Sequence, residues 1–196
     1  MFTGIIESIG KISSLTQDGG NIHIEIESEI ASELKVDQSV AHNGICLTVI
    51  SCDTKSHIVT AIDETISKTN LSSWKVAGQI NLERGMKLGD RLDGHIVQGH
   101  VDQVGTCIEV KDANGSWVYT FEYDTDLGNV TIEKGSITIN GVSLTVVSSS
   151  ANKFSVAIIP FTFENTTFKD IKPGSKVNLE FDVVGKYLQK LSQAYF

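Results

Sequence analysis

The sequence contains few of the residues that cross-link small secreted folds or hold structural metals. Its three cysteines, Cys46, Cys52 and Cys107, are an odd number and show no Cys-x-x-Cys spacing. We therefore expect neither a disulfide framework nor a metal site. Only two prolines occur, of which Pro173 lies in a Lys-Pro-Gly turn. No Gly-x-Gly-x-x-Gly or P-loop pattern is present, so nothing indicates a dinucleotide or nucleoside triphosphate site.

Positive charge is also sparse. The 196 residues include 16 Lys and Arg against 24 Asp and Glu, a formal net charge of −8, and the basic residues are scattered singly. Nucleic-acid binding is not expected, because nothing concentrates cations for phosphates. No stretch approaches the roughly 20 apolar residues of a membrane span, and the opening MFTGIIESIG has no basic region before an apolar run. We expect a soluble, cytoplasmic protein with no secretory signal and no membrane partner.

An internal repeat is the strongest feature that the sequence does contain. Three pairs of segments match in the same order: 4–10 with 99–105, 40–49 with 137–146, and 81–83 with 178–180. The offsets are 95 (99 − 4) and twice 97 (137 − 40 and 178 − 81). A period of this length is too long for a solenoid unit and is the size of a compact domain. The chain is therefore expected to carry two copies of one module.

Each copy contains a series of short strands. Residues 22–27, IHIEIE, alternate apolar and polar side chains, the period of a half-buried strand, and residues 117–123, WVYTFEY, are rich in aromatic residues. Asn43-Gly44 and Asn140-Gly141 lie between such runs and predict hairpin turns. We predict an all-β fold with one antiparallel barrel of about six strands per copy. A sandwich is the alternative that periodicity leaves open.

The segment 84–94, RGMKLGDRLDG, is rich in glycine and charge and is the expected linker. We place the two domains at residues 1–95 and 96–192. The tail differs, because its apolar residues fall at helical spacings and predict a helix over about 186–195: Tyr187, Leu188, Leu191 and Tyr195. A helix of about ten residues is marginal alone. It should therefore dock on its own barrel or on the same helix of neighbouring subunits.

The strand after each Asn-Gly turn offers small polar side chains on one face. Side chains alternate along a strand, so Cys46 and Thr48 share a face, as Ser143 and Thr145 do in the second copy. These are either exposed strand residues or one wall of a pocket, and their recurrence in register favours a pocket. Cys46 is a candidate nucleophile, although a small buried apolar cysteine is the commoner case. Because its counterpart is Ser143, a function shared by both copies cannot require a thiol.

Two histidines, His95 and His100, lie in the segment GHIVQGH. Five residues apart, they would point to opposite sides of one regular strand, so a metal pair is not expected. Either could bind a substrate or move a proton near neutral pH, or be solvated at a domain junction. Glu64-Thr65 in the first copy corresponds to Phe161-Thr162 in the second, so only the first copy has a carboxylate there. Residue reasoning alone predicts matched polar pockets and names no ligand.

Together, MFTGI, AHNGICLTV, GHIVQGH, INGVSLTV and the paired NLE segments closely resemble the riboflavin synthase family of the barrel type, over essentially the whole chain. The resemblance implies two six-stranded Greek-key barrels that each bind one 6,7-dimethyl-8-ribityllumazine, and a C-terminal helix that gathers three chains into a homotrimer. The implied reaction is a dismutation to riboflavin and 5-amino-6-(D-ribitylamino)uracil, with no cofactor. Lumazine synthase is the implied protein partner.

The resemblance also implies site residues, with Ser39, Cys46 and His100 as catalytic candidates. It assigns these residues to the first pocket, beside Ser39: Gly4, Ile5, Ile6, Cys46, Leu47, Thr48, Thr60, Ala61, Ile62, Asp63, Glu64 and Thr65. It assigns these to the second: Gly99, His100, Val101, Lys134, Ser143, Leu144, Thr145, Ala157, Ile158, Ile159, Pro160, Phe161 and Thr162. In the family, the first barrel of one subunit faces the second barrel of another.

Two departures from the family pattern concern the second pocket. Asn140 stands where many members carry an aspartate, and Phe161 stands where a glutamate is common. A non-catalytic lumazine- or flavin-binding protein, of the luminescence antenna type, is the main alternative, and a structural tandem barrel without a ligand is a third. The presence of Ser39, Cys46, His95 and His100 favours the enzyme.

Overall fold

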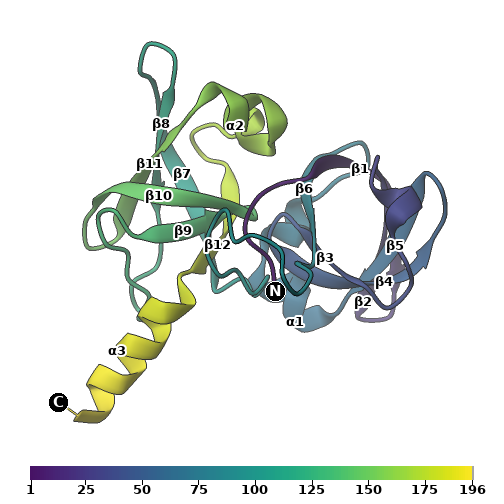
Figure 1. Ribbon diagram of the computed structural model, residues 1–196, viewed down its shortest axis with the longest axis horizontal. Coiled ribbons are helices and arrows are strands. Elements are labelled where there is room, and N and C mark those ends of the chain that lie inside the picture. The colour runs from purple at the N-terminus through teal and green to yellow at the C-terminus, as the bar shows by residue number, and fades with distance from the viewer. Residues whose placement is uncertain (196) are drawn as a thin grey trace.

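The computed structural model describes residues 1–195, with side chains as far as residue 192. Two closed barrels of antiparallel strands lie side by side, and a helix leaves the second barrel as a separate arm (Figure 1). Each barrel has six strands. The prediction of an all-β tandem barrel is therefore confirmed, and a sandwich is excluded for both copies.

The two barrels have the same topology. The first consists of β1 (Ser8–Asp18), β2 (Asn21–Glu27), β3 (Ser39–His42), β4 (Ile45–Cys52), β5 (Ser56–Ala61) and β6 (Gln79–Arg84). The second consists of β7 (Gln103–Asp112), β8 (Trp117–Glu122), β9 (Ser136–Ile139), β10 (Val142–Ser149), β11 (Lys153–Ile158) and β12 (Lys176–Phe181). In both, the second strand pairs with the fifth rather than with the third, which is the Greek-key arrangement. The boundary that we expected at residue 95 falls in the segment between β6 and β7.

Short helices follow the fifth strand of each barrel. They are α1 (Asp63–Lys68) and 3-10 helix η2 (Asn70–Ser73) in the first barrel, and α2 (Pro160–Asn165) and η3 (Thr167–Asp170) in the second; a further 3-10 helix, η1 (Ala31–Glu33), precedes β3. The Thr69 hydroxyl donates to the carbonyl oxygen of Thr65 (2.7 Å), and Thr166 makes the same bond to Thr162 (2.7 Å). The repeat thus extends to these helices.

The two Asn-Gly turns form as predicted and meet at the border of the barrels. Asn43 and Gly44 have φ values of 47° and 80°, and Asn140 and Gly141 have 46° and 82°. These left-handed conformations are those of a tight hairpin turn and favour asparagine followed by glycine. A Cβ on Gly44 would lie 2.8 Å from the backbone nitrogen of Gly141. Glycine is therefore needed for the close approach of the turns as well as for their φ angles.

Four buried asparagines join the barrels in a closed ring of hydrogen bonds. The Asn81 side chain donates to the carbonyl oxygen of Asn140 (2.9 Å), and the Asn178 side chain donates to that of Asn43 (2.9 Å). In return, the side-chain oxygens of Asn43 and Asn140 accept from the backbone N–H groups of Asn81 and Asn178, each at 2.8 Å. Asn140, where many members of the resembling family carry an aspartate, belongs to this interface.

Each barrel has its own hydrophobic core. Aliphatic side chains such as Ile24, Ile26 and Leu82 fill the first core, whereas the second also contains Phe121 and Phe154. Leu82 and Leu179 are both fully buried. The repeated Asn-Leu-Glu segment therefore contributes its asparagine to the interface and its leucine to the core.

The C-terminal helix α3 (Val183–Tyr195) begins earlier than the predicted residue 186. The cause is Asp182, whose carboxylate accepts from the N–H of Val184 (3.0 Å) and so caps the first turn. The Lys186 ammonium lies 2.9 Å from the Asp102 carboxylate and ties the helix base to the second barrel. The side chain of Tyr195, one of the four apolar residues that predict this helix, lies outside the described residues. No helix of residues 1–195 is long and apolar enough to cross a membrane.

Candidate functional site

The segment before each barrel crosses to the other barrel. The backbone N–H of Ser143 on β10 donates to the carbonyl oxygen of Gly4, and that of Cys46 on β4 donates to the carbonyl oxygen of Gly99, both at 2.8 Å. Phe2 and Val97, at the start of the two crossing segments, form an antiparallel bridge with each other. One strand of each barrel is therefore covered by the segment that precedes the other barrel.

Both crossing segments require glycine where they touch the strand. Gly4 and Gly99 have φ values of 78°. A Cβ on Gly4 would lie 2.5 Å from the Cβ of Ser143, and a Cβ on Gly99 would lie 2.7 Å from the Cβ of Cys46. Real Cβ atoms do not approach so closely, so any larger residue would push the segment away from the strand.

Two buried glutamates hold the crossing segments in place. The Glu83 carboxylate accepts from the backbone N–H groups of Thr3 (2.6 Å) and Gly4 (3.0 Å) and from the Thr3 hydroxyl (2.8 Å). The Glu180 carboxylate accepts from three consecutive backbone N–H groups, those of Gln98 (2.6 Å), Gly99 (2.9 Å) and His100 (3.0 Å). Burial raises the pKa of both carboxyl groups, and these hydrogen bonds oppose the shift. The glutamate of each Asn-Leu-Glu segment thus clamps a crossing segment, a role that its repetition in the sequence does not reveal.

The crossing corrects our grouping of the pocket residues. We expected residues 4–6 beside residues 46–48, and residues 99–101 beside residues 143–145. In the structure Ile6 packs on the second core and Val101 on the first. The sequence does not distinguish the two arrangements, because both copies carry the same motifs. The arrangements differ only in which barrel each crossing segment contacts.

We define the first site as residues 46–48, 60–65 and 99–101 with Ser39. Cys46 is half-buried on β4, and the exposed Ser39 and Thr48 are paired neighbours on β3 and β4. His100 is exposed on the crossing segment directly after Gly99. The three catalytic candidates, Ser39, Cys46 and His100, therefore all belong to this site.

We define the second site as residues 143–145, 157–162 and 4–6 with Lys134. Lys134 (φ 64°) donates its N–H to the carbonyl of Val146, as its counterpart Asp37 (φ 71°) does to Val49. An acidic residue, Asp37, therefore occupies in the first barrel the backbone position that Lys134 occupies in the second.

Not every predicted contact residue presents its side chain to a ligand. Leu47, Ala61 and Ile158 are at most 5% exposed and belong to the barrel cores, so only their backbone can line a site. The remaining residues of the predicted strand-and-helix sets are exposed or half-buried: Cys46, Thr48, Thr60, Ile62, Asp63, Glu64, Thr65, Ser143, Leu144, Thr145, Ala157, Ile159, Pro160, Phe161 and Thr162. These side chains form the outer surface of each site.

A histidine distinguishes the second site. The Ser143 hydroxyl lies 2.7 Å from Nδ1 of His95, whose Nε2 lies 3.2 Å from the Thr138 hydroxyl. Burial lowers the pKa of His95, while the Asp182 carboxylate acts in the opposite direction. In the first site, Cys46 occupies the strand position that Ser143 occupies in the second. His95 and His100 are five residues apart in the sequence, and the structure separates them: His95 lies at the second site and His100 at the first.

The short helices also differ between the sites. Glu64 on α1 pairs with Lys68 at 2.8 Å, and this ion pair lowers the pKa of the exposed carboxyl group. Its counterpart Phe161 on α2 is 72% exposed, an unusual position for an aromatic ring. On the same helix, Phe163 stacks on Trp117 with ring centroids 3.8 Å apart. The second site therefore has an apolar rim where the first has charge.

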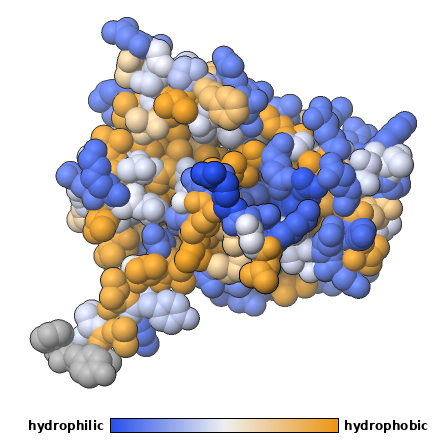
Figure 2. Space-filling view, in the orientation of Figure 1, coloured by the Kyte–Doolittle hydropathy of each residue, from blue (hydrophilic) through white to orange (hydrophobic). Residues whose placement is uncertain are grey.

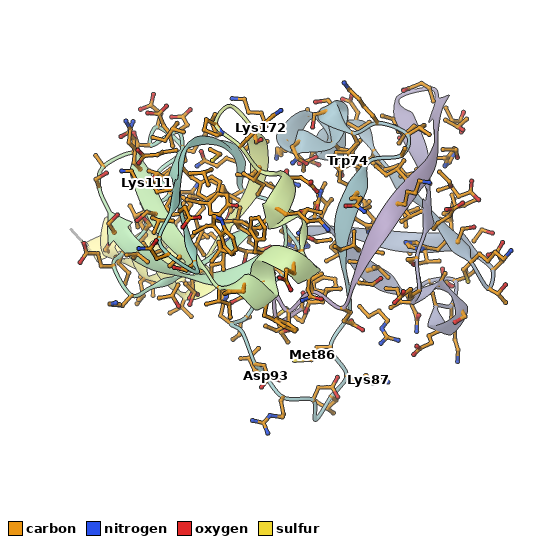
Figure 3. All side chains as sticks on the ribbon, turned by 90° about the horizontal axis from the view of Figure 1, so that it is seen from above. Trp74, Met86, Lys87, Asp93, Lys111 and Lys172 are labelled. Carbon is orange, nitrogen blue, oxygen red and sulfur yellow. The ribbon has the colours of Figure 1, made fainter. Side chains whose placement is uncertain are left out.

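A cleft of about 640 Å³ lies between the first barrel and the segment after β6. Ser39 of the first site and Ile5 of the second both line it. Met86, Lys87 and Asp93 lie on that segment, which projects from the barrels as a loop (Figure 3). Among the described residues, no group of three or more His, Cys, Asp or Glu side chains is arranged to hold a metal ion.

The structure is that of a tandem-barrel protein in which each barrel binds the segment that precedes the other barrel. This class of protein has two equivalent sites. The lumazine binding domain profile matches residues 3–85 and 98–182. The chain is 40% identical over 191 residues to the riboflavin synthase of Actinobacillus pleuropneumoniae, covering 97% of this chain and 89% of the relative. It is 38% identical over 193 residues to the riboflavin synthase of Photobacterium phosphoreum, covering 97% and 88%.

The solved structure of LumP complexed with riboflavin covers 92% of this chain and 99% of its own, with a TM-score of 0.85 at 23% identity. That similarity shows the fold. The match to both barrels and the full-length relatives show the family: this chain belongs to the riboflavin synthases with tandem lumazine-binding domains.

Proposed function

We propose that this chain is a riboflavin synthase that converts two molecules of 6,7-dimethyl-8-ribityllumazine into riboflavin and 5-amino-6-(D-ribitylamino)uracil, the last step of riboflavin biosynthesis. The observation that carries the proposal is the presence of two equivalent sites, each completed by a crossing segment that a buried glutamate holds. A reaction between two identical molecules needs two matched sites, and the lumazine binding domain family indicates the identity of the ligand.

The reaction is a transfer between the two substrates themselves. One lumazine gives up a four-carbon unit and becomes the ribitylamino-uracil, and the other receives the unit and becomes riboflavin. The C7 methyl group of the substrate is acidic, so holding two molecules in register supplies much of the catalysis. Donors at each site, such as the Thr48 and Thr145 hydroxyl groups, support the anion that forms on proton loss.

Within this scheme the first site supplies the catalytic candidates. Cys46 and Ser39 lie on adjacent strands, and His100 follows the glycine that bonds to Cys46. We assign to them proton transfer and transient addition at C7 of the lumazine. The second site contributes substrate binding through Ser143, Lys134 and the segment 4–6.

We further propose a homotrimer in which the first site of one chain faces the second site of another. Helix α3 supports this, because Val184, Leu188 and Leu191 are each at least 54% exposed along one protruding arm (Figure 2). Apolar surface on a helix that stands away from its barrel requires a partner. Truncation before Lys186 should lower trimer stability and activity together, and a fully active truncated monomer would contradict the intersubunit site.

The same resemblance supports an association with lumazine synthase, which co-sedimentation of the two proteins would test. The cytoplasm is the proposed compartment, and the three thiols, all free, suit a reducing environment.

The function is tested by incubating the purified chain with 6,7-dimethyl-8-ribityllumazine and no added cofactor. We expect riboflavin to form with time. Stable binding without turnover would instead indicate a lumazine carrier of the antenna type, and no binding would indicate a structural barrel pair.

A further inference from the structure

The last strand of each barrel holds one crossing segment at both of its ends, and a second carboxylate takes part in this. Glu7 and Asp102 occupy equivalent places in the repeat, at the offset of 95 (102 − 7). The Glu7 carboxylate accepts from the backbone N–H of Arg84 on β6 (2.7 Å), and the Asp102 carboxylate accepts from that of Phe181 on β12 (2.8 Å). Each crossing segment is thus fixed at its start by the clamp glutamate and at its end by its own acidic residue.

The cation that pairs with this acidic residue differs between the two barrels. In the first barrel it lies on the strand itself, because the Arg84 guanidinium donates through Nε to the Glu7 carboxylate (2.7 Å). Phe181 stands at the equivalent place of the second barrel, where its ring is buried in the core. Asp102 pairs instead with Lys186 of helix α3, whose ammonium nitrogen lies 2.9 and 3.0 Å from the two carboxylate oxygens. The second barrel therefore takes from α3 the charge that the first barrel supplies itself.

The Lys186 ammonium acts on both carboxylates that hold the segment 98–102. The side chains of Lys186 and Asp102 are 27% and 19% exposed, so water screens their charges less than those of a surface pair. Burial raises the pKa of the Glu180 carboxyl group, and the hydrogen bond from Gln98 and the Lys186 charge act in the opposite direction. One cation thus stabilises the charged form of both acceptors.

The segment 98–102 forms part of the first site. It carries His100, and its Gly99 carbonyl oxygen accepts from the N–H of Cys46 (2.8 Å). A shift of the segment would therefore move the His100 side chain relative to the strand of Cys46, and small displacements of catalytic groups lower rates strongly. The equivalent segment 3–7 is paired with a cation of its own barrel and does not depend on α3 in this way.

We propose that Lys186 is a positioning residue of the first site, through which the place of helix α3 controls the segment that carries His100. Helix α3 also presents the apolar surface through which we propose that the chains assemble. Assembly and the geometry of the first site are then linked by one ion pair. The consequence for catalysis rests on the proposed function, whereas the link between helix and segment rests on the contacts alone.

The test compares hydrogen exchange of backbone N–H groups in the full-length wild type and in Lys186→Met. The N–H groups of residues 98–100, which bond to the Glu180 carboxylate, should exchange about fivefold faster in the variant. Those of residues 3 and 4, which bond to the other clamp, should keep the wild-type rate. Lys190→Met, one turn further along the same helix, is the matched control and should behave as the wild type. Equal rates in Lys186→Met and the wild type, or equal acceleration of both segments, would overturn the proposal.

Two further variants test whether the ion pair itself is the cause. Lys186→Arg keeps a cation at this place and should retain wild-type exchange. The double variant Lys186→Met/Asp102→Asn removes both charges, so no carboxylate loses its partner, and residues 98–100 should exchange more slowly than in Lys186→Met. A double variant that exchanges as fast as Lys186→Met would contradict the role of the pair.

Turnover provides the functional readout. Lys186→Met should keep the oligomeric state of the wild type in sedimentation and lower kcat for 6,7-dimethyl-8-ribityllumazine about three- to tenfold, with Lys186→Arg close to the wild type. An unchanged kcat would overturn the positioning role, and dissociation of the oligomer would assign Lys186 to assembly instead. If the wild type makes no riboflavin, the proposed function fails, while hydrogen exchange still tests the link between helix and segment.

Discussion

The carbonyl oxygen of Gly99 accepts a hydrogen bond of 2.8 Å from the backbone N–H of Cys46. These residues belong to different repeats, and their bond brings the crossing segment against the strand that carries a catalytic candidate. The same bond joins Gly4 to Ser143. The duplicated chain therefore builds each site from both of its halves.

Replacing Gly99 by alanine should disrupt the first site. The new Cβ would lie 2.7 Å from that of Cys46, on a backbone with a φ of 78°. We expect a loss of about 2–4 kcal/mol in the free energy of unfolding, with turnover of 6,7-dimethyl-8-ribityllumazine reduced at least about tenfold. Gly19→Ala is the matched control, because Gly19 also has a positive φ but nothing lies within 4 Å of its added Cβ. Equal effects of the two variants would show that backbone strain, not the contact, matters.

The two glutamate clamps should act on different sites. Glu83→Gln places an NH2 group opposite the N–H donors of Thr3 and Gly4, and should cost about 1–3 kcal/mol in stability. Since Gly4 belongs to the second site, this variant should weaken lumazine binding there, whereas Glu180→Gln should weaken it at the first site. Ligand NMR signals from the two sites would separate these effects, with the exposed Glu27→Gln as control. Loss of binding at both sites in either variant would contradict the separate roles.

A buried histidine pair predicts how stability depends on pH. His42 and His57 have their Nε2 atoms 2.8 Å apart, and the Nδ1 of His42 lies 3.0 Å from the carbonyl oxygen of Val40. Burial lowers the pKa of His42 to about 3, with the charge of His57 adding to the shift, and burial lowers the pKa of His57 to about 4. Both rings are therefore neutral in the folded chain near pH 7.

An unfolded histidine titrates near pH 6.5, so below that pH the unfolded chain takes up more protons than the folded one. Stability should be fully present above about pH 6.5 and fall as the pH drops towards 4, by about 3 kcal/mol from His57. Denaturant unfolding of His57→Gln at pH 7 and pH 4.5 should show a smaller difference than the wild type, whereas His100→Gln should match it. An unchanged difference in His57→Gln would rule out the pair as the cause.

The thiol of Cys46 should be needed for rate and not for binding. Its counterpart Ser143 occupies the same strand position and makes the same backbone bond to a crossing glycine. Cys46→Ser should keep the KM for 6,7-dimethyl-8-ribityllumazine and lower kcat about tenfold, because a hydroxyl is a weaker nucleophile and acid than a thiol. Steady-state kinetics with Cys46→Ala as a second variant would check this, and an unchanged kcat in both would remove Cys46 from the chemistry.

Local signals in the sequence predicted much of the fold. The Asn-Gly turns at Asn43 and Asn140 specified two hairpins, and the repeat specified two barrels of one topology. The spacing of Tyr187, Leu188 and Leu191 predicts that helix α3 begins at about residue 186, whereas the cap of Asp182 begins it at Val183. Capping by a single side chain leaves no periodic pattern.

The exchange of the crossing segments could not be predicted in the same way. Gly4 and Gly99 occupy equivalent places in two similar repeats, so the sequence is compatible with either partner strand. The contacts that decide it, those of Ser143 and Cys46 with these glycines, join residues far apart in the chain. For the same reason, the sequence identifies Glu83 and Glu180 only as members of a repeat. It does not indicate that Ser143 is the hydrogen-bond partner of His95.

The most direct test of the account is the product ratio of a reaction that contains only the purified chain, buffer and 6,7-dimethyl-8-ribityllumazine. Chromatography would follow the lumazine, riboflavin and the ribitylamino-uracil together. We expect one riboflavin and one ribitylamino-uracil for every two lumazines consumed. Lumazine that stays bound and unchanged, or riboflavin formed in any other ratio, would contradict the pairing of two substrates at two matched sites.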